Sequence, residues 1–314
     1  ILATCIISSI ITERAARKII LRDKEIVSDE SPKDDEKILI PVKYPEYANR
    51  LVHLGMMMRN PKLNRGLVAL NVVYDDEKMR INQEIGRKLL EQVTQYASGS
   101  DVLMQTQVRV AANIANGIKH AFKEFDASEI IIGMHNHPNI SPRFWGQFHQ
   151  SLFNGLNRQI IMTRINYPLA TLRRIQVAVP SRAQYEPGFY RWLERLARVV
   201  KNLECRIQFH GRTDTLQMIG EYIKNKHSEI RAEYLVMEHW NEMPKLASSI
   251  AEDHLFVVVT ARKGTVSYKN ALDRLPDELT RYFSGKNLMI IFPDQYSDDK
   301  LLTMTFAASQ HTEE

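Results

Sequence analysis

Cysteine is almost absent from this chain of 314 residues, which contains only Cys5 and Cys205. The two lie far apart, and neither forms part of a C-x-x-C pair or of a cluster of cysteine and histidine. This scarcity argues against a disulfide-stabilised scaffold and against a zinc site. A reducing, cytosolic environment fits such a composition.

A strong excess of one charge is also missing. The 42 Lys and Arg residues are nearly balanced by 37 Asp and Glu residues, which leaves a formal net charge of +5 spread along the chain. Nucleic-acid-binding proteins concentrate basic residues in a patch or stripe. We therefore expect no nucleic-acid partner.

No apolar run is long enough to cross a membrane, which takes about 20 residues. The most apolar stretch, residues 1–11, is followed by basic residues such as Arg14 and Arg17, the reverse of the order in a signal peptide. That order is typical of the cytoplasmic end of a transmembrane helix, and a buried amphipathic helix is the alternative. We expect residues 1–20 to end a transmembrane or membrane-proximal helix, and residues 21–36 to form a charged linker.

The chain does contain a regular alternation of apolar, β-rich runs with amphipathic segments. In residues 37–166 the pattern predicts strands at 37–42, 66–74, 102–110, 128–133 and 159–163, with helices at 46–59, 77–96, 111–125 and from about 143. Such alternation predicts a doubly wound parallel α/β sheet. Its ligands should lie beyond the carboxyl ends of the strands, where the loops after Val42, Val73 and Gly133 converge.

The second half of the chain repeats this order. Strands are expected at 174–179, 203–209, 232–237, 255–260 and 287–292. We therefore predict two tandem α/β domains, 37–166 and 173–295, with residues 296–314 as a loosely held tail. The final strands of the two domains should pack against each other and form a pseudo-dimer, because isoleucine-rich edge strands need cover.

The loop after the fourth strand carries the most specific motif. Gly133-Met134-His135-Asn136, nine further residues and then Gly146-Gln147 keep the spacing G-x-x-G, nine residues, G-[S/T]. In this spacing and in the order of elements, the chain resembles the universal stress protein family, whose ATP-binding members carry that motif. The resemblance implies that ATP or another adenine nucleotide binds at these residues: Lys43, Val72, Gly133, His135, Asn136, Gly146 and Gln147.

Three of those positions depart from the family pattern. Asn136 replaces the second glycine, Gln147 replaces the hydroxyl residue, and Lys43 replaces an acidic residue that contacts the ribose. Asn tolerates a left-handed backbone and Gln can still donate a hydrogen bond. A lysine would favour a more heavily phosphorylated ligand or none. The residues leave open whether the loop binds a nucleotide or simply closes the sheet.

The whole arrangement of membrane-proximal segment, charged linker and two such domains resembles the cytoplasmic C-terminal region of a bacterial sodium (or potassium)/proton antiporter. That resemblance implies a regulatory or sensor region at the inner (plasma) membrane, whose partner is the transmembrane antiporter domain of the same polypeptide. Two alternatives remain: a free-standing tandem stress protein that binds or slowly hydrolyses ATP, and a scaffold that binds no ligand. Further homodimerisation is compatible with each of them.

Catalytic and metal-binding patterns are missing. No ordered nucleophile, base and acid can be found, and most Asp and Glu residues fall on predicted helical surfaces, so we expect no enzyme activity. His135 and His137 form an H-x-H pair without evident further ligands, so no metal is expected. The loop after Thr260 lacks the first glycine of the motif, which predicts no ATP site of the family type there, and Arg262 and Lys263 are expected to form a solvated basic loop.

Overall fold

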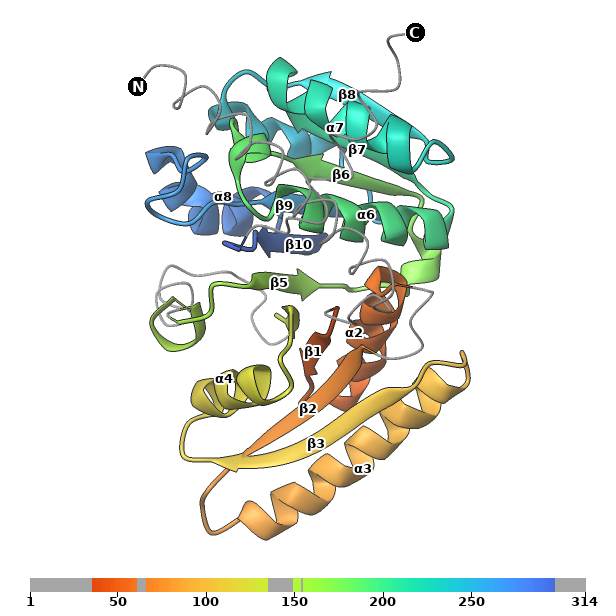
Figure 1. Cartoon of the computed structure of the whole chain (residues 1–314), viewed down its shortest axis with the longest axis vertical. Helices are drawn as coiled ribbons and strands as arrows, with labels where there is room; N and C mark the ends of the chain where they lie inside the picture. Colours follow the sequence, from red (N-terminus) through yellow and green to blue (C-terminus); the bar gives the residue numbers. More distant parts are fainter. Residues whose placement is uncertain (1–35, 61–65, 135–148, 154, 297–314) are drawn as a thin grey trace, which may run out of the picture. The chain divides into compact units, whose positions relative to one another are not determined.

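The computed structural model describes residues 36–60, 66–134, 149–153 and 155–296 (Figure 1). The chain divides into two units at Asp35 and Glu36, and the unit that begins at Glu36 is described here by itself. The helix expected at 1–20, nearly all of the linker and the tail lie outside the described residues. Within the described part of the chain, no helix combines the length and the apolar character that a membrane crossing requires.

The first half follows the predicted alternation, and its elements run as follows: β1 (Ile38–Pro41), α2 (Pro45–Met58), β2 (Leu67–Tyr74), α3 (Met79–Ser98), β3 (Met104–Ala111), α4 (Ile114–Glu124), β4 (Glu129–Gly133), the π-helical turn η1 (His149–Phe153) and β5 (Gln159–Arg164). Local sequence explains the helix starts. Pro45 opens α2 at a position that needs no backbone donor. At the start of α4, the Asn113 side chain accepts a hydrogen bond from the Asn116 backbone N–H at 3.2 Å.

The second half repeats the order after the short 3-10 turn η2 (Leu169–Thr171): β6 (Arg174–Ala178), η3 (Ala183–Tyr185), α6 (Phe189–Leu203), β7 (Arg206–Gly211), α7 (Thr213–Lys226), β8 (Ala232–Val236), η4 (Trp240–Ser249), β9 (His254–Val259), η5 (Asn270–Arg274), α8 (Leu275–Tyr282) and β10 (Asn287–Phe292). Most expected strand boundaries differ from the observed ones by one or two residues, and the start of β7 differs by three. β7 begins at Arg206 rather than at Leu203, because α6 continues through Leu203 and ends where Glu204 adopts a left-handed backbone, with φ of 52°.

The ten strands of the described residues form one sheet, in the order β3-β2-β1-β4-β5-β10-β9-β6-β7-β8. Each half thus has the same internal order, and the two halves meet at β5 and β10 (Figure 1). This central pair is antiparallel, with Ile161 opposite Ile291, whereas the other strand pairs of the described sheet are parallel. The predicted α/β class and the pseudo-dimer through the final strands are confirmed.

The two faces of the sheet carry separate hydrophobic cores, and both cores extend across the two halves. One face is covered by α2, α3, α6 and α7, with Leu54, Val93, Trp192 and Ile219 in one continuous cluster. The other face is covered by α4, η1, η4 and α8, with buried side chains such as Phe122 and Leu279. Central strands such as β5, β9 and β10 are buried on both faces and are nearly unbroken apolar runs, whereas the edge strands β3 and β8 are largely exposed and more polar.

Candidate functional site

The carboxyl ends of β1, β2 and β4 form the first-half edge at which the sequence predicted a ligand. β1 lies between β2 and β4, so the chain leaves neighbouring strands there in opposite directions, which is the usual position of ligand sites in such sheets. The loop after β1 is fixed by Asn71, whose buried amide donates to the Val42 carbonyl oxygen at 2.8 Å. Lys43 follows immediately and is exposed, with its Nζ 5.4 Å from the Tyr44 ring centroid.

Val72 and Gly133 also lie at this edge. The Val72 side chain is half-buried against α4, where a Cβ added to Gly117 would come within 2.6 Å of it. Gly133 ends β4 beside Thr163 of β5, and the backbone N–H of Met134 then donates to the Thr163 carbonyl oxygen at 2.9 Å. The structure therefore places Lys43, Val72 and Gly133 at or just beyond the ends of the neighbouring strands β1, β2 and β4. The other four predicted binding residues lie outside the described residues: His135, Asn136, Gly146 and Gln147.

A recess at the corresponding edge of the second half was not predicted. It lies beyond the carboxyl ends of β6, β7 and β8 and has a volume of about 20 Å³. Its lining includes Val179, Ser181, Arg212, Met237, Trp240 and Leu272. The apolar members form its walls, whereas Arg212 is exposed at the rim.

The loop after β9 was expected to be basic and solvated, and for Arg262 this expectation was wrong. Its side chain is buried and donates to the carbonyl oxygens of Leu156 at 2.6 Å and Arg158 at 2.7 Å. The guanidinium also lies 4.3 Å from the Phe153 ring centroid, and burial lowers its pKa to about 10. Arg262 thus ties the second half to the segment before β5, and only Lys263 is exposed as expected.

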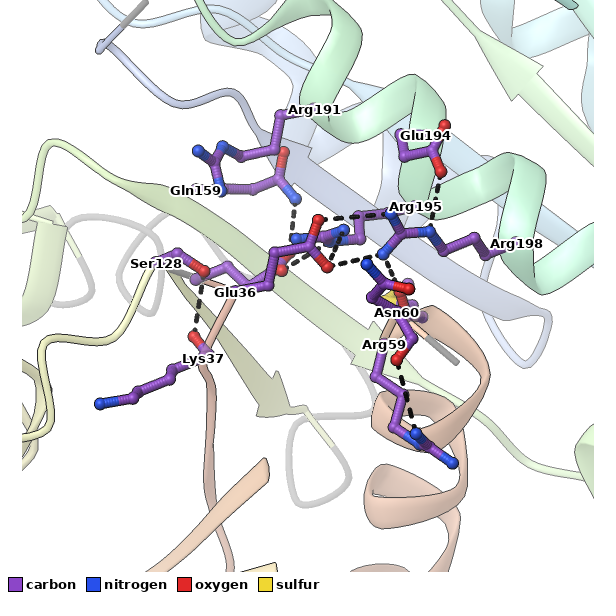
Figure 2. A network of polar contacts seen from close by, with 12 residues as sticks. Glu36, Lys37, Arg59, Asn60, Ser128, Gln159, Arg191, Glu194, Arg195 and Arg198 are labelled. Carbon is purple, nitrogen blue, oxygen red and sulfur yellow. Dashed lines mark hydrogen bonds and ion pairs between the residues drawn. The ribbon is translucent and has the colours of Figure 1, made fainter. Parts of the chain in front are cut away.

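A network of buried charges joins the two halves, and sequence reasoning missed it (Figure 2). Arg195 of α6 is 2% exposed; its Nε lies 2.6 Å from Glu129 Oε1 at the start of β4, and its Nη1 lies 3.1 Å from Glu36 Oε2. Arg198 reaches Glu36 Oε2 from the next turn, at 2.7 Å. Gln159 of β5 donates to the other oxygen of Glu129 at 2.8 Å.

The pKa values of this network follow from its charges. Burial opposes the charge on Arg195, but Glu129 and Glu36 outweigh it and raise its pKa above the usual value. Burial would likewise raise the pKa of Glu36, yet Arg195 and Arg198 lower it overall. Most Asp and Glu residues were expected on helical surfaces, and Glu129 is an exception, because it is fully buried at the start of β4. The sequence showed no sign of the network, because Arg191, Arg195 and Arg198 share one face of α6 with Glu194 and Asn202, a pattern typical of a solvated helix face.

Glu194 extends the network toward α7 and gives it a pH dependence. It accepts hydrogen bonds from Tyr222 at 2.6 Å and Arg198 at 2.8 Å, and its Oε2 lies 2.7 Å from His227 Nε2. Burial alone would raise the Glu194 pKa, but these partners, His227 first, lower it to about 2 from a usual value of 4.5. The ionised carboxylate therefore stabilises the folded state above pH 4.5, and this contribution is lost as the pH falls toward 2.

We expect Glu194→Gln to flatten the acid side of the stability profile. The variant should be less stable than the parent at pH 7, and its free energy of unfolding should fall less between pH 4.5 and 2, because it has no carboxylate to protonate. Urea unfolding across that pH range measures the difference. Glu221→Gln, on the exposed side of α7, is the matched control and should follow the parent. If the free energy of unfolding fell equally with pH in the parent and in Glu194→Gln, the lowered pKa would not belong to Glu194.

Comparison with known proteins supports the fold. No family model and no curated protein sequence matches the chain. Among solved structures, a universal stress protein from Archaeoglobus fulgidus superposes with a TM-score of 0.55 at 13% identity, over 84% of this chain and 98% of its own. The fold is universal stress protein-like.

A second solved structure has the same fold in another setting. The cytoplasmic domain of a prokaryotic cation chloride cotransporter superposes with a TM-score of 0.54 at 10% identity, over 85% of this chain and 98% of its own. At these identities the likeness concerns the fold alone, so the antiporter assignment and the nucleotide site remain predictions.

Proposed function

We propose that this chain is the cytoplasmic regulatory and sensor region of a sodium (or potassium)/proton antiporter at the inner membrane. In this proposal the transmembrane domain of the same polypeptide exchanges the ions, and the first half of the described unit binds an adenine nucleotide or another phosphorylated ligand. The observation that carries the proposal is the position of Glu36. It is the last residue of the predicted linker and is paired with Arg195 and Arg198 of the second half.

This pairing gives a physical route for regulation. Glu36 is joined to the linker through the backbone and to α6 through two arginines, so a shift of α6 relative to β1 would move the point at which the linker enters the fold. A ligand can drive such a shift only if it binds the two arrangements with different affinity. The first-half edge is well placed for this, because β4 carries Gly133 at one end and the Arg195 partner Glu129 at the other.

A binding role fits the charges better than a catalytic role. The buried ionic groups of the network are paired with one another across the two halves, and pairs of this kind hold a fold in one arrangement. Among residues 36–60, 66–134, 149–153 and 155–296, no three His, Cys, Asp or Glu side chains are grouped as a metal would need. The proposal therefore includes neither a metal nor a reaction.

ATP binding is the first test of the ligand. We expect ATP to bind the 314-residue chain, and Lys43→Glu to weaken binding about 10-fold or more, because a hydrogen bond to a charged group is replaced by repulsion. Isothermal titration calorimetry with ATP and AMP measures both affinities. Lys88→Glu makes the same charge change on the exposed surface of α3 and should bind ATP as the parent does.

The outcomes separate the alternatives. No heat with either nucleotide would favour the ligand-free scaffold, which the continuous ten-stranded sheet would also suit. If a nucleotide binds and the reading frame upstream encodes no membrane-spanning segments, a free-standing tandem stress protein is favoured. An upstream frame that encodes many apolar segments, together with ion exchange in membrane vesicles that changes with ATP and loses this response when the region is deleted, would support the antiporter.

A further inference from the structure

We propose that Arg174, Arg206 and Arg231, together called the arginine row, form a binding site for phosphate groups of a polyphosphorylated small molecule or of an anionic lipid headgroup. The row lies at the amino ends of β6, β7 and β8, the end of these strands opposite to the recess (Figure 1). It is separate from the nucleotide site proposed for the first half. Four features support it: the register of the arginines, their lack of partners, the cations beside them and the first-half counterpart of the row.

The three arginines lie directly side by side on neighbouring strands. Arg174 of β6 is in register with Arg206 of β7. Arg231 lies one residue before β8, and the pairing of Ile207 with Ala232 places it opposite Arg206. Residues opposite each other in a sheet point to the same face, and neighbouring strands are about 4.8 Å apart. The Cα atoms of the arginine row therefore span only about 10 Å.

The guanidinium groups of the arginine row have no hydrogen bond or ion pair within the part of the chain that the structure describes. Arg206 and Arg231 are exposed, and Arg174 is half-buried. The next side chain on the same face of β8, Glu233, accepts a hydrogen bond from Gln208 at 2.9 Å. Like charges directly opposite each other destabilise a sheet. Three unpaired arginines in one row therefore lower the stability of the free protein, and an anion would relieve this repulsion.

Two further basic side chains continue the row toward the middle of the sheet. His254 of β9 is in register with Arg174, and Lys286 lies opposite His254, one residue before β10. Lys286 Nζ donates to the Ile250 carbonyl oxygen. Burial lowers the pKa of His254; Asp253 raises it, whereas the charges of Arg174 and Lys286 lower it. The side chains of this end of the sheet thus lie close enough to act on one another electrostatically.

The first half has no comparable row, although its strands have the same order. The corresponding end of β1, β2 and β3 carries Lys37, Gly66 and Leu103, each one residue before the first paired positions. The row that follows these residues is wholly apolar. The fold therefore does not require arginines at this end of its strands. This difference favours a role in binding over a role in folding.

Phosphate is the anion that best matches the arginine row. A planar guanidinium fork binds two phosphate oxygens at once, whereas a lysine acts as a point charge. A ligand with several phosphate oxygens can bridge neighbouring arginines, which a single carboxylate cannot do. Because Arg206 and Arg231 are exposed, a soluble ligand and a bilayer surface can both reach them.

Titration with inorganic tripolyphosphate tests the site. The ring NMR signals of His254, identified with the variant His254→Gln, should shift saturably in the 314-residue chain, with a Kd below about 1 mM. These signals report on the arginine row, because His254 is in register with Arg174. In the second arm, vesicles of phosphatidylcholine and phosphatidic acid should bind the parent more tightly than a variant without the row, and vesicles of phosphatidylcholine alone should not distinguish them.

The two arms separate the sources of the phosphate. A response to tripolyphosphate alone assigns a soluble ligand, and a difference on phosphatidic acid vesicles alone assigns a lipid headgroup. Responses in both arms show that the row binds phosphate groups from either source. If neither arm responds, with tripolyphosphate tested up to about 10 mM, the proposal is wrong.

Variants tie the response to the row. Changing all three arginines to glutamine should weaken the active probe about 100-fold or more, and Arg206→Lys should weaken it about 3- to 10-fold, because lysine keeps the charge and loses the fork. The matched control removes three exposed charges from the first half, Arg80→Gln, Lys88→Gln and Lys123→Gln, and should bind as the parent does. An equal loss in the row variant and the control would contradict a site at the row.

Stability separates a binding role from a structural role. Arg206→Gln should leave the urea midpoint of the free protein unchanged or raise it, because the variant relieves repulsion. Tripolyphosphate should raise the midpoint of the parent more than that of the variant. A clear fall in the midpoint of Arg206→Gln would show that the row holds the fold together, contrary to the proposal. Lys43→Glu should leave the His254 response intact, so a failure of the first-half site can be told from a failure of this one.

Discussion

Replacing Arg195 by alanine should lower the free energy of unfolding by about 3–5 kcal/mol, which is the usual cost of removing one partner from a buried ion pair. The variant would leave Glu129 without its guanidinium partner at 0% exposure. Glu36 would keep Arg198, which lies 2.7 Å away, so the loss should fall mainly on Glu129. Urea unfolding at pH 7, followed by circular dichroism, measures the change.

Two further variants show whether the cost comes from charge pairing. Combining Arg195→Met with Glu129→Gln should be less harmful than the sum of the two single changes by about 0.5–3 kcal/mol, because no unpaired charge remains. Lys201 lies on the same helix as Arg195 and forms an exposed ion pair with Glu229. Lys201→Ala removes this pair and should lower the free energy of unfolding by no more than about 1 kcal/mol. A loss below about 1 kcal/mol for Arg195→Ala would contradict the proposed role of the network.

Ile290→Asp should be the most damaging single change at the junction of the halves, and we expect it to prevent stable folding of the 314-residue chain. Ile290 is fully buried in β10, between Met162 of β5 and Val258 of β9. An aspartate there would carry a charge without a partner and would also leave a cavity, and changes of this kind exceed about 4 kcal/mol. A loss of that size is comparable with the whole stability of many domains.

The comparison requires a milder variant and an exposed control. Ile290→Val keeps the strand apolar and should cost about 0.5–1.5 kcal/mol, which is measurable by urea unfolding even if Ile290→Asp is recovered only as aggregate. Ile81→Asp places the same charge on a side chain that is 65% exposed in the first turn of α3 and should be nearly neutral. A soluble, cooperatively unfolding Ile290→Asp protein would show that the halves do not depend on this strand.

The sequence predicted the central strands well because they are buried on both faces. β5 and β10 contain isoleucine runs that no surface position would favour, and their mutual pairing followed from the need to cover such edges. Lys43, Val72 and Gly133 lie at neighbouring strand ends, because parallel topology fixes that edge. The functional roles of all seven predicted binding residues stay predictions.

The buried network and the recess depend on distant partners, which a local pattern does not contain. Arg195 in an amphipathic helix is normally expected to face solvent, and its partner Glu129 lies 66 residues away in sequence. Ser181 and Trp240 come from connecting segments without periodicity, so only the folded chain brings them to one recess. Arg262 was assigned to solvent for the same reason, since its acceptors lie more than 100 residues earlier.

The central pairing joins two strands, β5 and β10, that the ribosome synthesises at different times. Thr163 of β5 donates to the Leu288 carbonyl oxygen 125 residues later, so the first half leaves the ribosome with this isoleucine-rich edge uncovered. At about 5–20 residues per second, its partner strand follows roughly 6–25 s later. An open apolar edge of this kind is a template for pairing with other chains. Nascent molecules of this protein should therefore need chaperone protection through the second half of translation, and fragments that end before residue 287 should aggregate.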